Sequence, residues 1–195
     1  MNNSKSTQKL VRLALLTAIL IVMEVTNIGY IKTPTGLEMT IMPVPVIIGA
    51  ILEGPAAGAI LGGVFGLTSF IQCFGKSAFG AVLLGINPFY TFIVCFVTRV
   101  LMGLCCGLIF KALNKDGKGV VSFSIASLSG AFLNTLFFMT ALILLFGKTD
   151  FIMGFRGSMG VIKFVIMFVG TQGLIEAIVC FVVGAALSKA LWKLR

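Results

Sequence analysis

Apolar residues run along nearly the whole chain and are interrupted only by short polar groups. Because a membrane-spanning helix takes about 20 apolar residues, this pattern predicts an all-α integral membrane bundle of six transmembrane helices, forming one domain over residues 1–195. The first apolar run, Leu10 to Ile31, is too long for a signal peptide, so we expect it to be retained. The predicted helices lie at about 8–29, 40–52, 55–73, 83–112, 119–146 and 159–191.

Composition strengthens the membrane prediction. Hydrophobic residues make up 58% of the chain and charged residues 11%, with a mean hydropathy of +1.12, which is more apolar surface than one soluble core could bury. The net charge of +9 could indicate nucleic-acid binding. The basic residues instead stand in small groups at segment ends, as membrane orientation requires, so no nucleic-acid partner is expected.

Several kinds of catalytic site are missing from the sequence. It has no G-x-x-x-x-G-K-S/T phosphate loop, so it is not expected to hydrolyse ATP by itself. It has no histidine, which excludes an H-E-x-x-H metal site and a Ser–His arrangement. Its five cysteines lie in apolar runs without C-x-x-C spacing and are interpreted as small hydrophobes. We therefore predict no enzyme, no metal site and no cofactor.

The basic residues also predict an orientation. An even number of helices places both termini on one side, and that side carries nine basic residues against about five on the other. The positive-inside rule then places both termini of this multi-pass cell-membrane protein in the cytoplasm. The longer loops 29–40 and 147–160 lie outside, where each is either a plain connection or a lid over a pocket. The nine basic residues are Lys5, Lys9, Arg12, Lys111, Lys115, Lys118, Lys189, Lys193 and Arg195.

Small residues recur at a spacing of four in three of the predicted helices. Such strips let helix backbones approach closely in a membrane. The glycines at 54, 58, 62 and 66, with Gly103 and Gly107, are predicted to pack inside the bundle. Ala14 and Ala18 form a similar strip on the first helix, which could pack inside the bundle or dock another membrane subunit.

Polar residues at membrane depth mark a candidate site, because ionisable side chains there need a partner, water or a function. Arg99 and Glu176 lie at similar depths and could pair with each other or contact a ligand, and Glu24 is a third buried charge. Uncharged polar residues share the outer halves of several helices, which predicts a cavity for a polar small molecule entered from outside. They are Asn27, Tyr30, Ser69, Gln72, Asn87, Tyr90, Asn134 and Gln172.

The order and spacing of several motifs resemble a known family over nearly the whole chain. The motifs are "ALLTA", "MPVPVIIGAILEGPAAGAILGGVFG", "INPFYTFIVCFVTRVLMG", "GAFLNTLFF" and "GLIEAIV". They resemble the substrate-binding S components of energy-coupling factor (ECF) vitamin transporters. The resemblance implies that Ala14 and Ala18 face a transmembrane coupling subunit and that the loop over 30–40 covers a bound vitamin. It also implies two cytoplasmic ATPase partners and an S component that tips in the lipid.

The resemblance also bears on which vitamin is bound. The "PVPVIIGAILEGP" and "INPF" motifs look most like S components assigned to pantothenate, and Arg99 would then face the substrate carboxylate. Riboflavin members typically carry an acidic, lysine-containing stretch where this chain has "GLEMTIMPVP". Thiamine members tend to have a tryptophan-rich pocket, whereas the single tryptophan here is Trp192. Riboflavin, folate, thiamine and pyridoxine stay open as alternatives.

A second hypothesis is a stand-alone secondary transporter of a small polar molecule, with Glu24 or Glu176 as a proton carrier. Secondary transporters are commonly built from inverted repeats, and no such repeat is evident in this sequence. Proton-driven uptake by the chain alone would favour this hypothesis.

Overall fold

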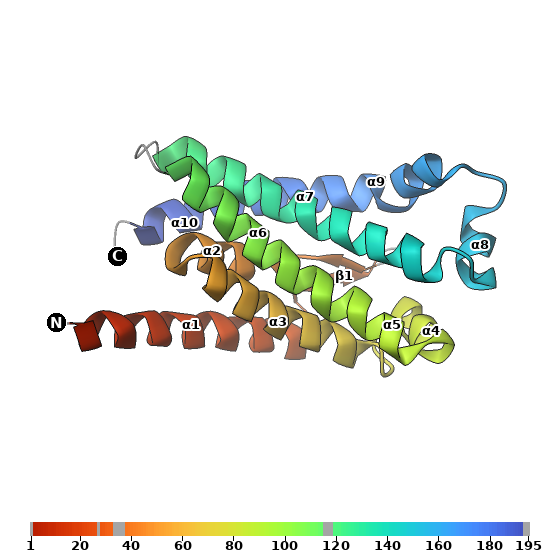
Figure 1. The fold of residues 1–195 in the computed structure, drawn as a ribbon, viewed down its shortest axis with the longest axis horizontal. Helices are drawn as coiled ribbons and strands as arrows, with labels where there is room; N and C mark the ends of the chain where they lie inside the picture. Colours follow the sequence, from red (N-terminus) through yellow and green to blue (C-terminus); the bar gives the residue numbers. More distant parts are fainter. Residues whose placement is uncertain (1, 27, 33–37, 115–118, 193–195) are drawn as a thin grey trace.

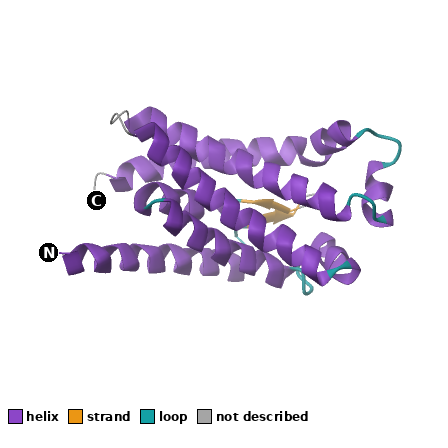
Figure 2. Cartoon of the chain, viewed as in Figure 1, coloured by secondary structure: helices purple, strands orange, loops and turns teal. Residues whose placement is uncertain are grey.

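The computed structural model describes residues 2–26, 28–32, 38–114 and 119–192. The described part is a helical bundle with one short β-hairpin (Figure 2). In chain order the elements are α1 (Asn2–Val25), β1 (Tyr30–Lys32), β2 (Glu38–Thr40), α2 (Pro43–Glu53), α3 (Pro55–Gln72), α4 (Ala78–Ile86), α5 (Pro88–Phe92), η1 (Ile93–Val97), α6 (Thr98–Leu113), α7 (Gly119–Phe146), α8 (Asp150–Arg156), α9 (Val161–Val179), η3 (Cys180–Gly184) and α10 (Ala185–Trp192).

The bundle is elongated, and both ends of the chain lie at the same end of it (Figure 1). We call this the terminal end. The short helices α4, α5 and α8 lie at the opposite end, and the hairpin of β1 and β2 lies between the helices (Figure 1). Placing both termini together is the arrangement that an even number of crossings produces.

The glycine strip of α3 packs against α6, as predicted. A Cβ added at Gly58 would collide with the carbonyl oxygen of Gly103, and one at Gly62 would collide with that of Arg99. A Cβ at Gly66 would lie 2.7 Å from the Cα of Phe96. Only glycine allows these backbones to come so close, so internal packing is confirmed for Gly58, Gly62 and Gly66. It is wrong for Gly54, where nothing lies within 4 Å of an added Cβ, because this glycine forms the turn before α3.

Helix α2 lies wholly inside the bundle, and all eleven of its residues are buried. Pro43 and Pro45 occupy its first turn, where a missing backbone donor costs little. The sequence predicted an irregular start in a protein-shielded position, and the helix instead begins regularly at Pro43. Gly54, with a positive φ of 93°, then reverses the chain into α3, a conformation that glycine adopts without a steric penalty.

The structure supports part of the predicted set of spans. Four described helices are long and apolar enough to cross a membrane, and a fifth is possible if α8 and the first part of α9, bent by 83°, count as one span. Helix α2 is apolar but short. The count of six and the cytoplasmic termini therefore stay predictions. The four helical ranges are Pro55–Gln72, Pro88–Leu113, Val121–Phe146 and Gly173–Trp192.

Two predicted segments are less regular than the hydropathy pattern indicated. The segment predicted at 83–112 is broken at Asn87, where the backbone is extended. The Asn87 side chain accepts a hydrogen bond from Tyr90 N at 3.1 Å and so caps a new helix, α5. The predicted loop 147–160 contains α8, which Thr149 caps by accepting from Ile152 N. Turn chemistry overrides hydropathy at both places, because apolar content does not show where a helix breaks.

The outer surface of the bundle is strongly apolar. Large side chains are more than half exposed on α1, α7 and α9, as shown by Leu15, Leu144 and Ile162. Apolar faces of this extent fit a lipid environment rather than water.

Candidate functional site

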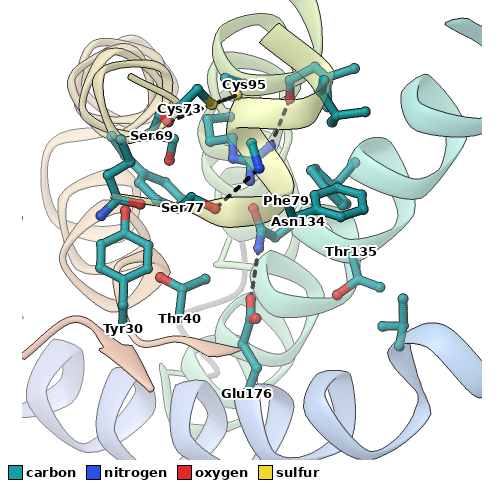
Figure 3. A pocket seen from close by; sticks show the side chains of 18 of the residues that line it. Tyr30, Thr40, Ser69, Cys73, Ser77, Phe79, Cys95, Asn134, Thr135 and Glu176 are labelled. Carbon is teal, nitrogen blue, oxygen red and sulfur yellow. Dashed lines mark hydrogen bonds between the residues drawn. The ribbon is translucent and has the colours of Figure 1, made fainter. Parts of the chain in front are cut away.

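A cavity of about 140 Å³ lies between the hairpin, α3, α4, η1, α6, α7 and α9 (Figure 3). It is built where the C-terminal part of α3 faces the start of α6 and the middle of α7. The sequence predicted a cavity for a polar molecule, and the structure brings six of the ten predicted binding residues to its wall. These six are Tyr30, Ser69, Gln72, Arg99, Asn134 and Glu176.

Arg99 is a buried cation held by the turn before it. Its Nη1 donates to the carbonyl oxygen of Val94 at 2.7 Å and to Thr98 Oγ1 at 2.9 Å. Val94 lies in the π-helical turn η1, a distortion that is frequent at functional sites. The guanidinium also lies over the rings of Phe65 and Phe138, at 5.4 and 4.9 Å. Nε has no hydrogen-bond partner among the described residues, so the cation keeps unused donor capacity beside the cavity that Arg99 lines.

Glu176 pairs with Asn134 and not with Arg99. Asn134 Nδ2 donates to Glu176 Oε1 at 2.8 Å. The ion pairs within the described part of the chain involve other residues, so the suggested Arg99–Glu176 pair is wrong. Similar depth along two helices did not specify contact, because Asn134 of α7 stands closer to the carboxylate. Arg99 and Glu176 nevertheless line the same cavity.

Glu24 lies behind the cavity wall. Gln72 Nε2 donates to Glu24 Oε2 at 3.0 Å, and Lys76 Nζ lies 3.7 Å from Glu24 Oε1. Glu24 is thus held by one amide and one cation, whereas Gln72 is the member of this group that reaches the cavity.

The β-hairpin closes one side of the cavity. Tyr30 and Thr40 are paired across the two antiparallel strands, and both line the cavity. Figure 3 shows their side chains rising from the strands toward the site. The tip of this loop, residues 33–37, lies outside the described residues.

Apolar side chains complete the wall. Four phenylalanines, at 65, 79, 138 and 168, face the cavity together with Cys73 and Cys95, whose sulfurs are 3.8 Å apart. Within the described ranges, no three His, Cys, Asp or Glu side chains are placed to hold a metal ion. The wall therefore combines the Arg99 cation and the Glu176 carboxylate with two amides, several hydroxyls and aromatic surface. Glu176 accepts from Asn134, whereas Arg99 has no carboxylate partner among the described residues, so Arg99 is the group that would attract an anionic part of a small polar molecule.

Four predicted binding residues are not shown at the cavity. Asn87 caps α5, and Tyr90 is 38% exposed and packs edge-on against Phe146 at 6.1 Å. The structure does not bring either of them to the cavity wall. Asn27 lies outside the described residues, and so does the side chain of Gln172.

Sequence reasoning missed other lining residues. Thr40, Ser77 and Thr135 join the polar wall. Thr135 lies in α7, where a threonine can satisfy its own helix backbone. Thr40 in β2 and Ser77, which caps α4, stand at the ends of apolar segments, where polar residues are common, so none of the three gave a signal. The phenylalanines gave none either, because the chain has 18 of them and most fill packing positions.

Ala14 and Ala18 lie on the exposed face of α1, so they do not pack inside the bundle. The opposite face buries Leu16, Leu20 and Glu24. Arg12 was expected among the basic residues at the terminal end, and its Nε instead lies 2.9 Å from Glu53 Oε1 in a largely buried ion pair. Lys115, Lys118, Lys193 and Arg195, which the orientation argument also used, lie outside the described residues.

Fold and site together define a class: a helical membrane protein with a polar cavity and, among the described residues, no evident catalytic group. Comparisons with known proteins agree with this class. The family model "ECF transporter, substrate-specific component" matches residues 8–188. The chain belongs to this family, whose members are membrane transport components and not enzymes.

Two named relatives are similar to the chain. It is 33% identical over 150 residues to the pantothenic acid transporter PanT of Lactococcus lactis subsp. cremoris, covering 70% of this chain and 73% of the relative. It is 30% identical over 142 residues to the pantothenate transporter PanT of Leuconostoc mesenteroides subsp. mesenteroides, covering 70% and 68%.

Proposed function

We propose that this chain is the substrate-binding subunit of an ECF importer and that it captures pantothenate from outside the cell. The observation that carries the proposal is Arg99, a buried cation at the cavity that has unused donor capacity and no carboxylate partner among the described residues. Pantothenate has one carboxylate, one amide, two hydroxyls and a branched aliphatic group. Its carboxylate would be bound by Arg99, and its methyl groups would pack on the phenylalanines.

The proposed orientation follows from the bundle. If the terminal end is cytoplasmic, as the basic residues predict, the cavity lies in the half nearer the outside and the hairpin of β1 and β2 covers it. Residues 30–40 then act as the lid. This proposal uses six membrane crossings, with α1 and α2 included.

The proposed partners are a transmembrane coupling subunit and two cytoplasmic ATPases. The exposed strip of Ala14 and Ala18 on α1 supports the first of these, since small residues on a lipid-facing surface let another helix approach closely. The missing phosphate loop supports the second, because the energy must then come from another chain.

A binding screen tests the proposal. The purified chain is heated in the presence of pantothenate, riboflavin, folate, thiamine or pyridoxine, one at a time. A ligand at 100 times its dissociation constant adds about 2.7 kcal/mol of stability, so we expect pantothenate alone to raise the melting temperature. If another vitamin raises the melting temperature instead, that vitamin replaces pantothenate as the proposed substrate. If no vitamin raises the melting temperature, the proposed function is contradicted.

An uptake assay separates the alternative of a stand-alone proton-coupled transporter. Proteoliposomes that contain only this chain should not accumulate pantothenate under a pH gradient. Accumulation would show that Glu24 or Glu176 carries protons and that no ATPase is needed.

A further inference from the structure

Two pairs of a carboxylate and an amide stand at the cavity. In each pair, the amide nitrogen donates a hydrogen bond to the carboxylate. Asn134 Nδ2 donates to Glu176, and Gln72 Nε2 donates to Glu24. All four side chains are more than nine-tenths buried. An ionised carboxylate can only accept hydrogen bonds, whereas an amide has a donor end and an acceptor end. Each carboxylate therefore fixes the orientation of its amide.

The fixed orientation leaves the carbonyl oxygen of each amide for other partners. Asn134 Oδ1 is buried and has no hydrogen-bond partner among the described residues. Figure 3 shows the nitrogen of Asn134 directed at Glu176 and its oxygen turned the opposite way. An unpaired buried acceptor is unfavourable, so a donor from a bound molecule would complete this site.

The second pair follows the same logic from the other side of the cavity. Glu24 does not line the cavity, but Gln72 does, and Lys76 Nζ lies 3.7 Å from the other carboxylate oxygen of Glu24, Oε1. Because Gln72 Nε2 donates to Glu24 and Gln72 lines the cavity, its carbonyl oxygen is the end of the amide left for a ligand. The cavity thus combines two fixed acceptors with one cation, Arg99.

We infer that Glu24 and Glu176 are positioning residues that hold the amides of Gln72 and Asn134 with their oxygens toward the ligand. The site then selects a molecule that carries two hydrogen-bond donors in addition to its anionic group. This inference rests on the proposed function, which supplies pantothenate as the ligand. It assigns the selectivity for ligand hydroxyl groups to Glu24 and Glu176, which act through the amides that they orient.

The test compares pantothenate with its keto analogue, in which the secondary hydroxyl is oxidised to a carbonyl that can only accept. In the wild-type protein, the carbonyl oxygen of the analogue would face an amide carbonyl oxygen of the site, and neither can donate a hydrogen bond. We therefore expect the analogue to bind about 5- to 150-fold more weakly than pantothenate. Glu24→Gln and Glu176→Gln keep the side-chain size but let the adjacent amide turn and donate to the analogue. In at least one of these variants, the dissociation constant of the keto analogue should exceed that of pantothenate by about threefold or less.

Glu53→Gln is the matched control. Glu53 is equally buried, but it pairs with Arg12 and does not line the cavity, so its variant should keep the wild-type ratio. If both cavity variants weaken the two ligands equally and keep the ratio, the carboxylates serve only structure and the inference is wrong. Should one variant fail to fold, the other tests the same statement with its own amide.

A ligand-free measurement separates this inference from the proposed function. In ¹⁵N spectra of the wild-type protein, the side-chain amide signal of Asn134 is assigned by its loss in Asn134→Ser. It should move in Glu176→Gln and stay in place in Glu53→Gln. If pantothenate does not bind but this signal moves, the substrate is wrong and the positioning stands; an unmoved signal overturns the positioning.

Discussion

Helices α3 and α6 play different roles in the two halves of the bundle. Toward the terminal end, Gly58 and Gly103 bring the two backbones into direct contact. The spacing of four continues beyond the last glycine to Phe70, whose ring packs against Phe92 with centroids 5.2 Å apart. Arg99 stands at the junction of the two halves: its backbone lies against Gly62, and its side chain lines the cavity. Close backbone packing in one half thus positions the binding groups of the other.

The largest effect is expected from filling the glycine contact. Gly58→Leu places a side chain against the backbone of Gly103, which cannot move without separating α3 from α6. Overpacking costs about 1–3 kcal/mol, occasionally more, and we expect the upper end or a failure to fold. Thermal melting in detergent measures the loss. Gly85→Leu is the control, because nothing lies within 4 Å of a Cβ there, and an equal loss in both variants would contradict the contact.

A smaller loss, confined to the cavity half, is expected from Arg99→Gln. Removing the cation from a buried charge pair with the ligand costs about 2–5 kcal/mol, which corresponds to a weakening of pantothenate binding by about 30-fold or more. Isothermal titration of the purified variant gives the dissociation constant. Unchanged affinity in a folded variant would show that the carboxylate binds elsewhere.

The ion pair at the terminal end should affect stability and leave binding unchanged. Arg12→Gln leaves Glu53 as a buried carboxylate without its cation. Breaking a buried pair costs about 3–5 kcal/mol, and we expect about 1–2 because Arg12 is 30% exposed. Denaturation with and without pantothenate measures both properties. The double variant Arg12→Gln, Glu53→Gln should recover stability, and a further loss would contradict the pairing.

The smallest effect on the isolated chain is expected from Ala14→Trp. Both alanines of the strip are exposed, so stability should change by no more than about 0.5 kcal/mol and pantothenate should bind as before. Transport by the assembled complex should nevertheless be lost, because the ring keeps the coupling subunit away. Loss of binding in the isolated variant would show that the strip supports the bundle instead.

Much of this architecture follows from sequence pattern alone. Hydropathy predicted the helices at 55–73 and 119–146 nearly as α3 and α7 occur, and the spacing of four predicted how Gly58 and Gly62 pack. Both signals depend on periodicity along a single helix, which a sequence displays directly. Breaks were harder, because the start of α5 depends on the side chain of Asn87 and not on apolar content.

The cavity was predictable in kind but not in membership. Polar residues at shared depth correctly indicated a cavity, yet depth did not show that Glu176 meets Asn134 instead of Arg99. The partner of a buried charge depends on how helices are rotated about their axes, and that rotation is set by packing between elements far apart in sequence. No role was predicted for Glu53, because its partner Arg12 was counted only among the basic residues beside the termini.

The central claim is that a buried cation in this cavity recognises the carboxylate of pantothenate. The most direct test is to titrate the wild-type protein with pantothenate and with pantothenol, which has an alcohol in place of the carboxylate. We predict that pantothenate binds at least about tenfold more tightly, since a hydrogen bond to a charged group is worth about 1.5–3 kcal/mol. Equal affinity for the two molecules would contradict the account.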